Sequence, residues 1–360
     1  MPARCDDGPE VMDAPEPTDD PEPTDEPDPT DELRRRAGPL AALPRPGLGR
    51  TRERFHALWE LGTVDVTLAR LGEAHADGHA ILAEAGRCDL AGVDGDAALF
   101  GVWAAEPPDG RVSIERESNG WQLRGTKRWC SGASLIDKAL VTAHRGEEIL
   151  LACVEVRAGG VSPHPVGEWA TPALVGTDTR SVDFDVHLDS TAVVGPTGWY
   201  LARAGFWWGG AGVAAIWAGG ADGLLVRLLP VWRDDPISLA HLGAVHASVE
   251  AARAMIESVA SAIDADPAMA AAAAARFTYC ARHTADLTAT TVIAHTTRAL
   301  GPGPMTQDRH VSRRLADLAL YIRQSHAERD LAALGASSSP VTTPGLGVRR
   351  APEVEGGCRG

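Results

Sequence analysis

The sequence predicts an α+β protein in three consecutive parts: a short N-terminal helical region, a middle antiparallel β domain and a C-terminal four-helix bundle. Three changes of pattern along the chain predict this order. Apolar residues recur at helical spacing across residues 51–85. Between about residues 98 and 195, apolar and polar residues alternate, as they do in strands that bury one face. From about residue 199 to 335, the composition returns to the alanine, leucine and arginine that favour helices.

Residues 1–45 are expected to form a disordered, acidic and proline-rich tail. Residues 15–32 are three similar hexapeptides, PEPTDD, PEPTDE and PDPTDE, which are too polar and too rich in proline to build a core. Residues 1–32 hold thirteen acidic residues and one arginine, which account for −12 of the formal net charge of −15. The rest of the chain therefore carries about −3, and no basic patch indicates a nucleic-acid partner.

Residues 46–97 are predicted to be the N-terminal helical region, and residues 98–198 the β domain. The helical spacing of the first part is carried by Phe55, Leu58, Trp59, Leu61, Leu68, Leu71, Ile81 and Leu82. In the second part, alternation is clearest in SVDFDVHLD at 181–189, and the pattern is similar in RVSIERE, GWQLRG, KALVTAH and EILLACVEV. Gly, Pro, Asn or Asp bounds each segment, so the sequence predicts strands joined by turns in a compact barrel or sandwich.

Residues 199–335 are predicted to be the helical bundle, and residues 336–360 a second disordered tail. Residues 204–221 are eighteen uncharged residues in a row, which borders on the length of a membrane span. Because six of them are glycine and few are Leu, Ile or Val, we expect a buried core helix and no membrane partner. The motif GAGVAA at 210–215 matches a dinucleotide-binding pattern, but it lacks the preceding strand that such a site requires.

The cysteines and histidines show no pattern of a disulfide framework or a metal site. The six cysteines, at positions 5, 88, 130, 153, 280 and 358, have no paired spacing, which indicates reduced thiols in a cytoplasmic protein. The N-terminus also lacks the apolar stretch of a signal peptide. His75 and His79 lie four residues apart on a predicted helix, a spacing that suits metal ligands. No third ligand is evident, so we expect surface or interface histidines and no metal.

One short stretch departs from the composition of the chain. The sequence has two lysines against thirty-two arginines, and Lys127 stands in GTKRWCSGAS at 125–134. This stretch ends the predicted strand GWQLRG, so Trp129 and Ser131 are expected on the same side of an extended segment. A flat indole beside a hydroxyl could stack on a planar cofactor and hydrogen-bond to its edge. A core tryptophan and a turn serine would explain the same residue types.

Three stretches together resemble the acyl-CoA dehydrogenase superfamily over roughly residues 50–335. GVWAAEPPDG at 101–110 is similar to the family's Thr-Glu-Pro turn at the entry to its β domain. GWQLRGTKRWCSGA at 120–133 resembles the family's Gly-x-Lys-x-Trp-Ile-Thr-Asn-Gly segment and is the most specific of the three. The third stretch is the helical end at 301–335. The resemblance implies an acyl-CoA dehydrogenase-like fold, with an N-terminal helical region only about half as long as is usual in the family.

The resemblance implies that FAD binds between the β domain and the bundle of a homodimer or homotetramer. Trp129 would lie against the isoalloxazine ring, and Ser131 would replace the family's threonine at the flavin N5 edge. Ala105 and Glu106 would meet the flavin at the Thr-Glu-Pro turn, where Ala105 replaces the threonine that contacts the pyrimidine edge. Lys127 would fix this region rather than take part in chemistry. The flavin would carry out the redox chemistry, and the protein would supply stacking and hydrogen bonds.

Family chemistry also needs a carboxylate that removes the substrate α-proton. Alignment of the terminal helix places the usual glutamate at Ser325, and the alternative position, within FWWGGAGVAA, holds no acid. His326 and Glu328 are the nearest candidates, because a histidine can act as a base near neutral pH. A cluster of charges at a helix end would explain the sequence HAERD equally well.

The resemblance favours an FAD-dependent oxidoreductase of acyl-CoA dehydrogenase type. Its substrate would be an acyl-CoA or a related small molecule, and its partner an electron-transfer protein or a flavin reductase. Two alternatives stay open. A flavin-dependent monooxygenase of the same fold would use reduced flavin and dioxygen, and the missing glutamate together with His326 favours it. A non-catalytic structural or binding subunit is favoured by the short N-terminal region and by Ala105.

Overall fold

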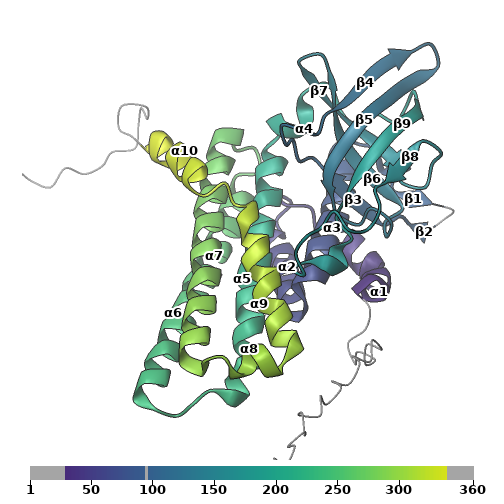
Figure 1. Ribbon diagram of the computed structural model, residues 1–360. Helices are drawn as coiled ribbons and strands as arrows, with labels where there is room; N and C mark the ends of the chain where they lie inside the picture. Colours follow the sequence, from purple (N-terminus) through teal and green to yellow (C-terminus); the bar gives the residue numbers. More distant parts are fainter. Residues whose placement is uncertain (1–28, 94–95, 339–360) are drawn as a thin grey trace, which may run out of the picture.

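The computed structural model describes residues 29–93 and 96–338, in which a curled sheet stands beside a bundle of long helices (Figure 1). The helices are α1 (Pro29–Ala41), α2 (Thr51–Val64), α3 (Val66–Glu84), α4 (Trp199–Ala202), α5 (Ala204–Leu228), α6 (Pro236–Ala265), α7 (Ala271–Leu300), α8 (Gly303–Gln307), α9 (Arg309–Tyr321) and α10 (Glu328–Ser338). The strands are β1 (Gly92–Val93), β2 (Asp96–Ala97), β3 (Phe100–Trp103), β4 (Val112–Glu117), β5 (Gly120–Cys130), β6 (Lys138–Arg145), β7 (Glu148–Glu155), β8 (Val161–Pro163) and β9 (Arg180–Asp189). This arrangement confirms the predicted α+β class.

Helix α1 is a difference from the sequence prediction, which assigned residues 1–45 to a disordered tail. The end of the last hexapeptide begins a helix, because it places two acidic residues in the first turn, where they complement the helix dipole. Leu33 is fully buried and Leu40 is 6% exposed, so one face of α1 packs on α3. The prediction is therefore wrong for α1. Residues 1–28 and 339–360 of the two predicted tails lie outside the described residues.

Helix α3 joins α1 and the sheet through two histidines. His75 is fully buried, its Nε2 lies 2.9 Å from Ala37 O, and its Nδ1 accepts from Phe100 N at 3.2 Å. Burial lowers the pKa of His75 to about 4, so the ring is neutral and its proton is on Nε2. His79 Nε2 lies 3.2 Å from Ala98 O. The histidines hold the helix–sheet interface, and no group of three or more potential metal-ligating side chains occurs among the described residues.

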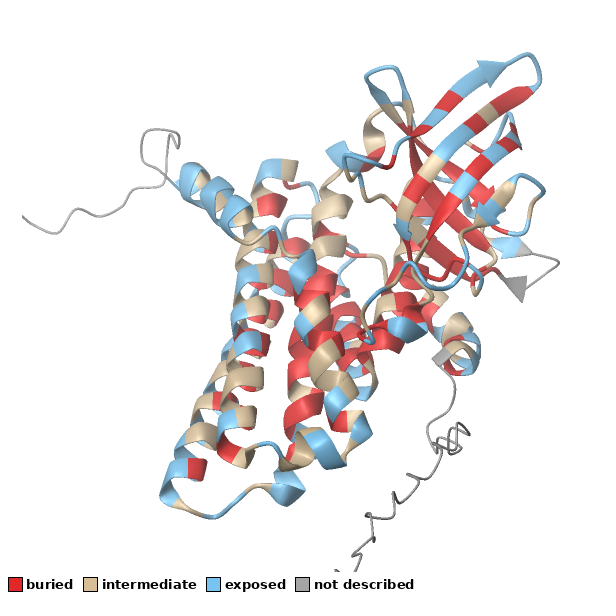
Figure 2. Ribbon diagram, viewed as in Figure 1, coloured by how far each residue is buried: buried red, intermediate tan, exposed pale blue. Residues whose placement is uncertain are grey.

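The β domain is one seven-stranded sheet in the order β3, β6, β4, β5, β9, β8, with β7 paired to β6. The five predicted strand segments are confirmed as β4, β5, β6, β7 and β9. The prediction of an antiparallel sheet is wrong along β6, because β3 and the start of β4 both run parallel to that strand. Two intervening strands separate β3 from β6 along the chain, and such a crossover permits parallel pairing. Buried and exposed residues alternate along β9 (Figure 2), so the sheet buries one face inside its curl.

Helix α5 is the core of the bundle, because it packs against α2, α6, α7 and α9. The helical segment Ala204–Val231 consists of α5 and the 3-10 turn that follows it. In the described part of the chain it is the one segment long and apolar enough to cross a membrane, and 72% of its most apolar stretch is buried by the protein itself. The predicted core helix over residues 204–221 is therefore confirmed. At Gly219, an added Cβ would lie 2.1 Å from Trp59 O, so only glycine allows α2 to approach α5 this closely.

The motif GAGVAA lies entirely within α5, and α4 rather than a strand precedes that helix. A dinucleotide-binding fingerprint needs a strand before its glycines, so this geometry excludes that interpretation. At the other end of the bundle, α10 continues to Ser338, three residues into the segment predicted as the C-terminal tail.

Candidate functional site

Lys127 on β5 is fully buried although it carries a charge. Its Nζ lies 2.5 Å from Glu106 Oε1, and it donates to Thr142 Oγ1 at 2.8 Å and to Thr142 O at 3.0 Å. Glu106 also accepts from Thr142 Oγ1 at 2.6 Å, and His144 Nε2 lies 3.0 Å from its other oxygen. Each ammonium proton therefore has an acceptor. Lys127 ties the turn after β3 to strands β5 and β6.

The ionisation of this pair is set by two opposing effects. Burial lowers the pKa of Lys127, and the hydrogen bond and charge of Glu106 oppose that effect. Burial would raise the pKa of Glu106, but hydrogen bonds from Lys127, Thr142 and His144 hold it below its ordinary value. Glu106 is therefore ionised at neutral pH. Its neighbour Ala105 is half-buried and offers only backbone groups to a ligand.

Trp129 interrupts strand β5. The register between β5 and β9 shifts between Lys127 and Cys130, and Trp129 has a φ of 58°. This left-handed backbone costs a non-glycine residue roughly 1–2 kcal/mol. Trp129 is 55% exposed, whereas Ser131 is 8% exposed. The expectation that the two share one side of an extended segment is wrong, because the bulge ends the regular alternation at Trp129.

Ser131 begins a row of hydroxyl groups at the end of β5. Ser131 Oγ lies 2.9 Å from Thr179 Oγ1, which lies 2.7 Å from Thr177 Oγ1. Thr177 Oγ1 in turn donates to Leu174 O at 2.7 Å. The backbone at Ser131 is fixed as well, since Trp103 Nε1 donates to Ser131 O at 2.9 Å. The row ties the end of β5 to residues 174–179, the segment that leads into β9.

Residues 174–179 also contact the bundle. Leu174 N donates to Asp317 Oδ1 on α9 at 2.5 Å, and Thr67 Oγ1 on α3 donates to Asp317 Oδ2 at 3.3 Å. Asp317 is 2% exposed, and burial raises its pKa. Tyr321 follows Asp317 by one helical turn and lies on the same face of α9. The end of β5, helix α3 and the end of α9 thus meet at one junction, which is our candidate site.

Two buried polar atoms near this junction have no hydrogen-bond partner. Tyr321 OH and Trp217 Nε1 belong to side chains that are fully buried, and neither atom is paired. The two rings meet edge to face, with their centroids 6.1 Å apart. Arg282 Cζ lies 4.6 Å from the Trp217 centroid. Since unpaired buried groups cost free energy, they indicate a place where water or a ligand binds.

Helix α3 adds a buried acid to these groups. Glu73 is 8% exposed, and Arg70 Nη1 donates to its Oε2 at 3.1 Å. Burial, followed by the charge of Asp77, raises the pKa of Glu73 to about 8. Asp77 keeps its own charge partner, Arg54 Nη2, at 2.6 Å. Glu73 therefore holds a proton at neutral pH, which suits a group that donates or accepts protons in a functional site.

Ser325, His326 and Glu328 lie in and just after the loop that joins α9 to α10. Ser325 Oγ accepts from the backbone N–H two residues further on, at 3.2 Å. The His326 side chain is 67% exposed, with Nδ1 3.5 Å from Asp330 Oδ1. Glu328 is exposed in the first turn of α10. Arg282 Nε lies 3.8 Å from Asp330, so a chain of charges links this loop to the buried groups.

The structure brings together two of the stretches that carried the resemblance, since Glu106 and Lys127 are in contact. Glu73, Tyr321 and Thr179 are not among the site residues predicted from the sequence. For Glu73, the available signal was its position four residues before Asp77, which places two acids on one face of a predicted helix. Nothing in the local sequence around the tyrosine and the threonine marked them as part of a site.

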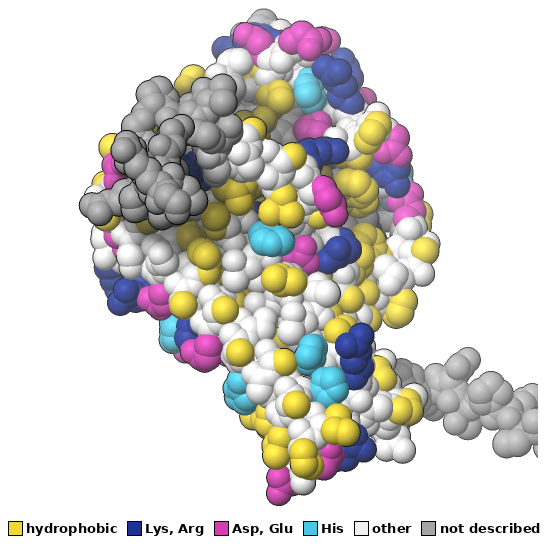
Figure 3. All heavy atoms as spheres, turned by 90° about the vertical axis from the view of Figure 1, so that its left-hand side faces the viewer, with side chains coloured by type: hydrophobic (Ala, Val, Ile, Leu, Met, Phe, Trp, Pro, Cys, Tyr) yellow, Lys and Arg dark blue, Asp and Glu magenta, His cyan; other side chains and the backbone are white. Residues whose placement is uncertain are grey.

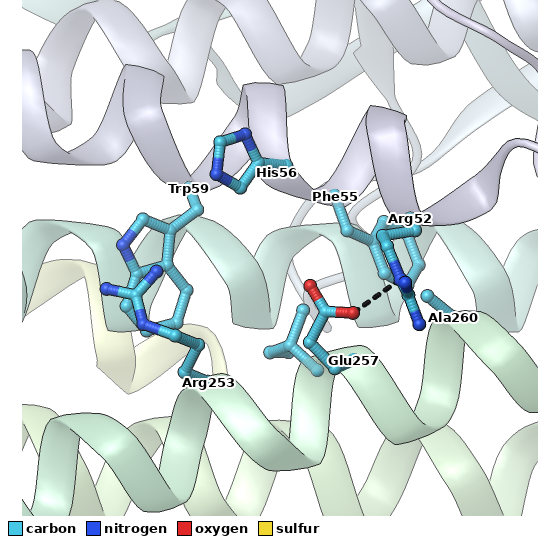
Figure 4. A pocket seen from close by; sticks show the side chains of 8 residues that line it. Arg52, Phe55, His56, Trp59, Arg253, Glu257 and Ala260 are labelled. Atoms are coloured by element: carbon cyan, nitrogen blue, oxygen red, sulfur yellow. Dashed lines mark ion pairs between the residues drawn. The ribbon is translucent and has the colours of Figure 1, made fainter.

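A groove between α2 and α6 is a weaker candidate (Figure 4). It is lined by Arg52, Phe55, His56, Trp59, Arg253, Ile256, Glu257 and Ala260. Arg52 Nε and Glu257 Oε2 pair at 2.5 Å, and the Arg253 guanidinium lies 4.5 Å from the Trp59 ring centroid. Because these charged groups satisfy one another, the groove presents little to hold a ligand.

A second depression lies between α3 and the start of α5, where Asp77, Glu84, Arg203 and Trp208 are among its lining residues. Arg203 Nη1 pairs with Glu84 Oε2 at 2.5 Å. Trp208 Nε1 is buried without a partner. Asp77 belongs both to this depression and to the buried acid pair, so the depression adjoins the candidate site and is not a separate one.

No protein-family model matches the chain, and no curated protein matches it. Solved structures do match. The dibenzothiophene monooxygenase TdsC from Paenibacillus sp. A11-2 superposes with a TM-score of 0.68 at 19% identity, covering 86% of this chain and 89% of that chain. KijD3, in complex with FMN and an amino-keto-sugar nucleotide, superposes with a TM-score of 0.73 at 17% identity. The match covers 89% of this chain and 88% of KijD3. The methanesulfinate monooxygenase MsuC from Pseudomonas fluorescens superposes with a TM-score of 0.63 at 16% identity. The match covers 88% of this chain and 98% of MsuC.

These similarities extend over most of each chain and show the fold. The protein has an acyl-CoA dehydrogenase-like fold, as the resemblance predicted. At identities below one fifth, they show the fold alone, so the activity of this chain has to be argued from its own residues.

Proposed function

We propose that this chain is a flavin-dependent monooxygenase that receives reduced flavin from a separate reductase, rather than an acyl-CoA dehydrogenase. The main observation that supports this proposal is the presence of Ser325 at the position implied for the catalytic base. A dehydrogenase needs a positioned base at the site, but the position implied for it holds a hydroxyl that accepts a hydrogen bond within its own loop. His326 beside it is 67% exposed, where water competes with it. Two similar structures are those of monooxygenases, TdsC and MsuC, which favours the proposal.

A flavin fits the groups at the junction. Trp129 presents an exposed indole, and Ser131 lies two residues further on with a slightly exposed hydroxyl-bearing side chain. Tyr321 OH and Trp217 Nε1 are buried polar atoms that a bound molecule could pair. An isoalloxazine ring is planar and has hydrogen-bonding edges, which suits a flat aromatic surface beside polar groups. We propose that Trp129 and Ser131 hold the ring and that the backbone of residues 105–106 meets its pyrimidine edge.

The proposed cofactor is FMN, where the family resemblance implied FAD. The solved structures of TdsC and KijD3 include complexes with FMN. The turn that carries Ala105 lacks a side-chain hydroxyl, so ring binding would depend on stacking and backbone donors there. FAD stays the alternative, and both flavins belong in the binding test.

When bound, the reduced flavin would supply two electrons and two protons, so that one atom of dioxygen enters the substrate and the other leaves as water. The residues of the chain would prepare this chemistry. Helix α5 would supply a largely apolar wall in which Trp217 is fully buried and its Nε1 is an unpaired polar atom. Glu73 holds a proton at its carboxyl group, and Arg70 and Asp77 fix that group in place. His326 is the proposed secondary proton carrier at the loop, since water can reach it.

We also propose a small-molecule substrate, a reductase partner and a homodimer or homotetramer. The oligomer is supported by exposed apolar side chains on the outer face of the bundle, where Ile237 is 74%, Leu239 46% and Leu287 57% exposed. Hydrophobic side chains and histidines gather on the lower part of this face (Figure 3). Exposed apolar patches often mark subunit contacts, and light scattering at several concentrations would measure the mass.

The test is an anaerobic flavin experiment. The purified protein is loaded with FMN or FAD, and acyl-CoA thioesters are added while the absorbance of oxidised flavin is followed. We expect no thioester to bleach the flavin. After a reductase has reduced the flavin, we expect admitted oxygen to be consumed. Bleaching by a thioester would establish dehydrogenation and contradict the proposal, and a protein that binds neither flavin would favour a non-catalytic subunit.

A further inference from the structure

The row of hydroxyls that begins at Ser131 has only one consistent arrangement of protons. Each hydroxyl can donate one proton and accept through its lone pairs. Thr177 Oγ1 lies 2.7 Å from Leu174 O, a carbonyl that can only accept, so the Thr177 proton is committed to it. Thr177 and Thr179 are 2.7 Å apart, so Thr179 must donate to Thr177. Ser131 and Thr179 are 2.9 Å apart, so Ser131 must donate to Thr179.

This order leaves the Ser131 hydroxyl with no proton for a ligand. Its two lone pairs can only accept hydrogen bonds. The side chain is 8% exposed, and the Trp103 indole holds its backbone carbonyl at 2.9 Å, so the hydroxyl has little freedom to turn away from the row. Any group that binds Ser131 Oγ must therefore bring an N–H or O–H of its own.

We propose that Ser131, as an obligate acceptor, makes this site select reduced flavin over oxidised flavin. The inference rests on the proposed function, in which Ser131 holds the flavin ring, and on the family resemblance, which implies that the N5 edge of the ring lies at Ser131. In reduced flavin, N5 carries a hydrogen that can be donated, whereas in oxidised flavin N5 is itself an acceptor and would face a lone pair. The Ser131–Thr179–Thr177 row is then a positioning device that acts through one oxygen atom. A protein that receives reduced flavin from a separate reductase needs this preference.

The test measures the dissociation constants of oxidised and chemically reduced FMN, anaerobically, by titration of the full-length protein. We expect reduced FMN to bind more tightly than oxidised FMN by about tenfold, the scale of one hydrogen bond. Thr179→Val has nearly the same shape and removes the acceptor of the Ser131 proton, which is then free to point at the flavin. We expect the ratio of the dissociation constants of oxidised and reduced FMN to fall to about one or below it. Ser131→Ala removes the acceptor oxygen itself, so the same ratio of dissociation constants should come close to one.

The matched control is Ser113→Ala, which removes an exposed serine on β4 in the same sheet, outside the hydroxyl row. It should leave the preference unchanged. If Thr179→Val does not fold, Ser131→Ala decides the matter. Equal binding of both flavin forms by the wild type, or a preference that both variants leave unchanged, overturns this inference and leaves the proposed function standing. Failure to bind either form overturns the proposed function and this inference with it.

Discussion

Lys127 and Glu106 form an ion pair in which the ammonium group is fully buried while the carboxylate remains partly open to solvent. Lys127 Nζ lies 2.5 Å from Glu106 Oε1, and the side chains are 0% and 34% exposed. The pair joins two stretches that lie 21 positions apart in the sequence. It explains why a chain with two lysines places one here: its compact ammonium group reaches both Glu106 and Thr142 inside the sheet.

Because Lys127 is more deeply buried than Glu106, replacing one or the other should lower the free energy of unfolding by different amounts. Glu106→Gln leaves a buried ammonium without a counter-charge, so we expect it to lower the free energy of unfolding by about 3 kcal/mol. Lys127→Met leaves a carboxylate that water can reach, so we expect about 1–2 kcal/mol. Urea unfolding of both variants measures the two costs, and a larger loss for Lys127→Met would contradict this account.

The exposed indole of Trp129 predicts a binding role that is separate from stability. Trp129→Ala should weaken FMN binding by about ten- to a hundredfold, the range found for stacking on an aromatic side chain. Because the side chain is 55% exposed, the free energy of unfolding should change by no more than about 0.5 kcal/mol. Flavin fluorescence titration measures the affinity. Trp129→Phe keeps an aromatic face and should retain most of it, and unchanged binding by Trp129→Ala would remove the residue from the site.

The buried acid Glu73 predicts a dependence of stability on pH. Its pKa rises from 4.5 to about 8 in the folded protein. Between these values the folded state binds more protons than the unfolded state, so the free energy of unfolding contributed by Glu73 falls as pH rises through this window. This contribution stops changing above about pH 8, where Glu73 is ionised in both the folded and the unfolded state. The slope is at most about 1.4 kcal/mol per pH unit.

Urea unfolding across that pH range compares the wild type with Glu73→Gln. The variant should lose this part of the dependence, because a glutamine does not titrate. Glu60→Gln, at a position that is 67% exposed on α2, is the control and should follow the wild type. Identical pH profiles for Glu73→Gln and the wild type would show that the carboxyl is not held protonated.

Turnover of a confirmed substrate should separate the buried acid from the loop residues. We expect Glu73→Gln to lower turnover by about a hundredfold, at the low end of general acid–base effects. His326→Ala should cost about tenfold or less, since an exposed histidine competes with water. Glu328→Gln should have no effect. A larger loss with His326→Ala than with Glu73→Gln would make the loop histidine the main proton carrier.

The sequence was sufficient to predict elements whose pattern is local. The strands β4, β5, β6, β7 and β9 were predicted because one-sided burial imposes alternation, and α5 because its uncharged run exceeds any strand in length. Helix α1 was missed because its first residues repeat a motif that is typical of solvated tails. Its two apolar contacts, Leu33 and Leu40, become informative only once α3 is in place.

The candidate site could be predicted only in part, because its contacts are long-range. Trp129 and Ser131 were found through a local motif, but the bulge that exposes Trp129 depends on pairing with β9. The bond from Leu174 to Asp317 spans 143 positions, and no local pattern indicates it. The raised pKa of Glu73 depends on burial between helices that are distant in sequence. Such environments are set by the packed fold.

The position of the flavin is the central claim, and hydrogen–deuterium exchange tests it most directly. Full-length protein is compared with and without saturating reduced FMN. We expect slower exchange in residues 126–134 and 174–179, where the end of β5 meets the hydroxyl row, and no change along α6. Unchanged exchange in both segments, or protection confined to the groove between α2 and α6, would contradict this claim.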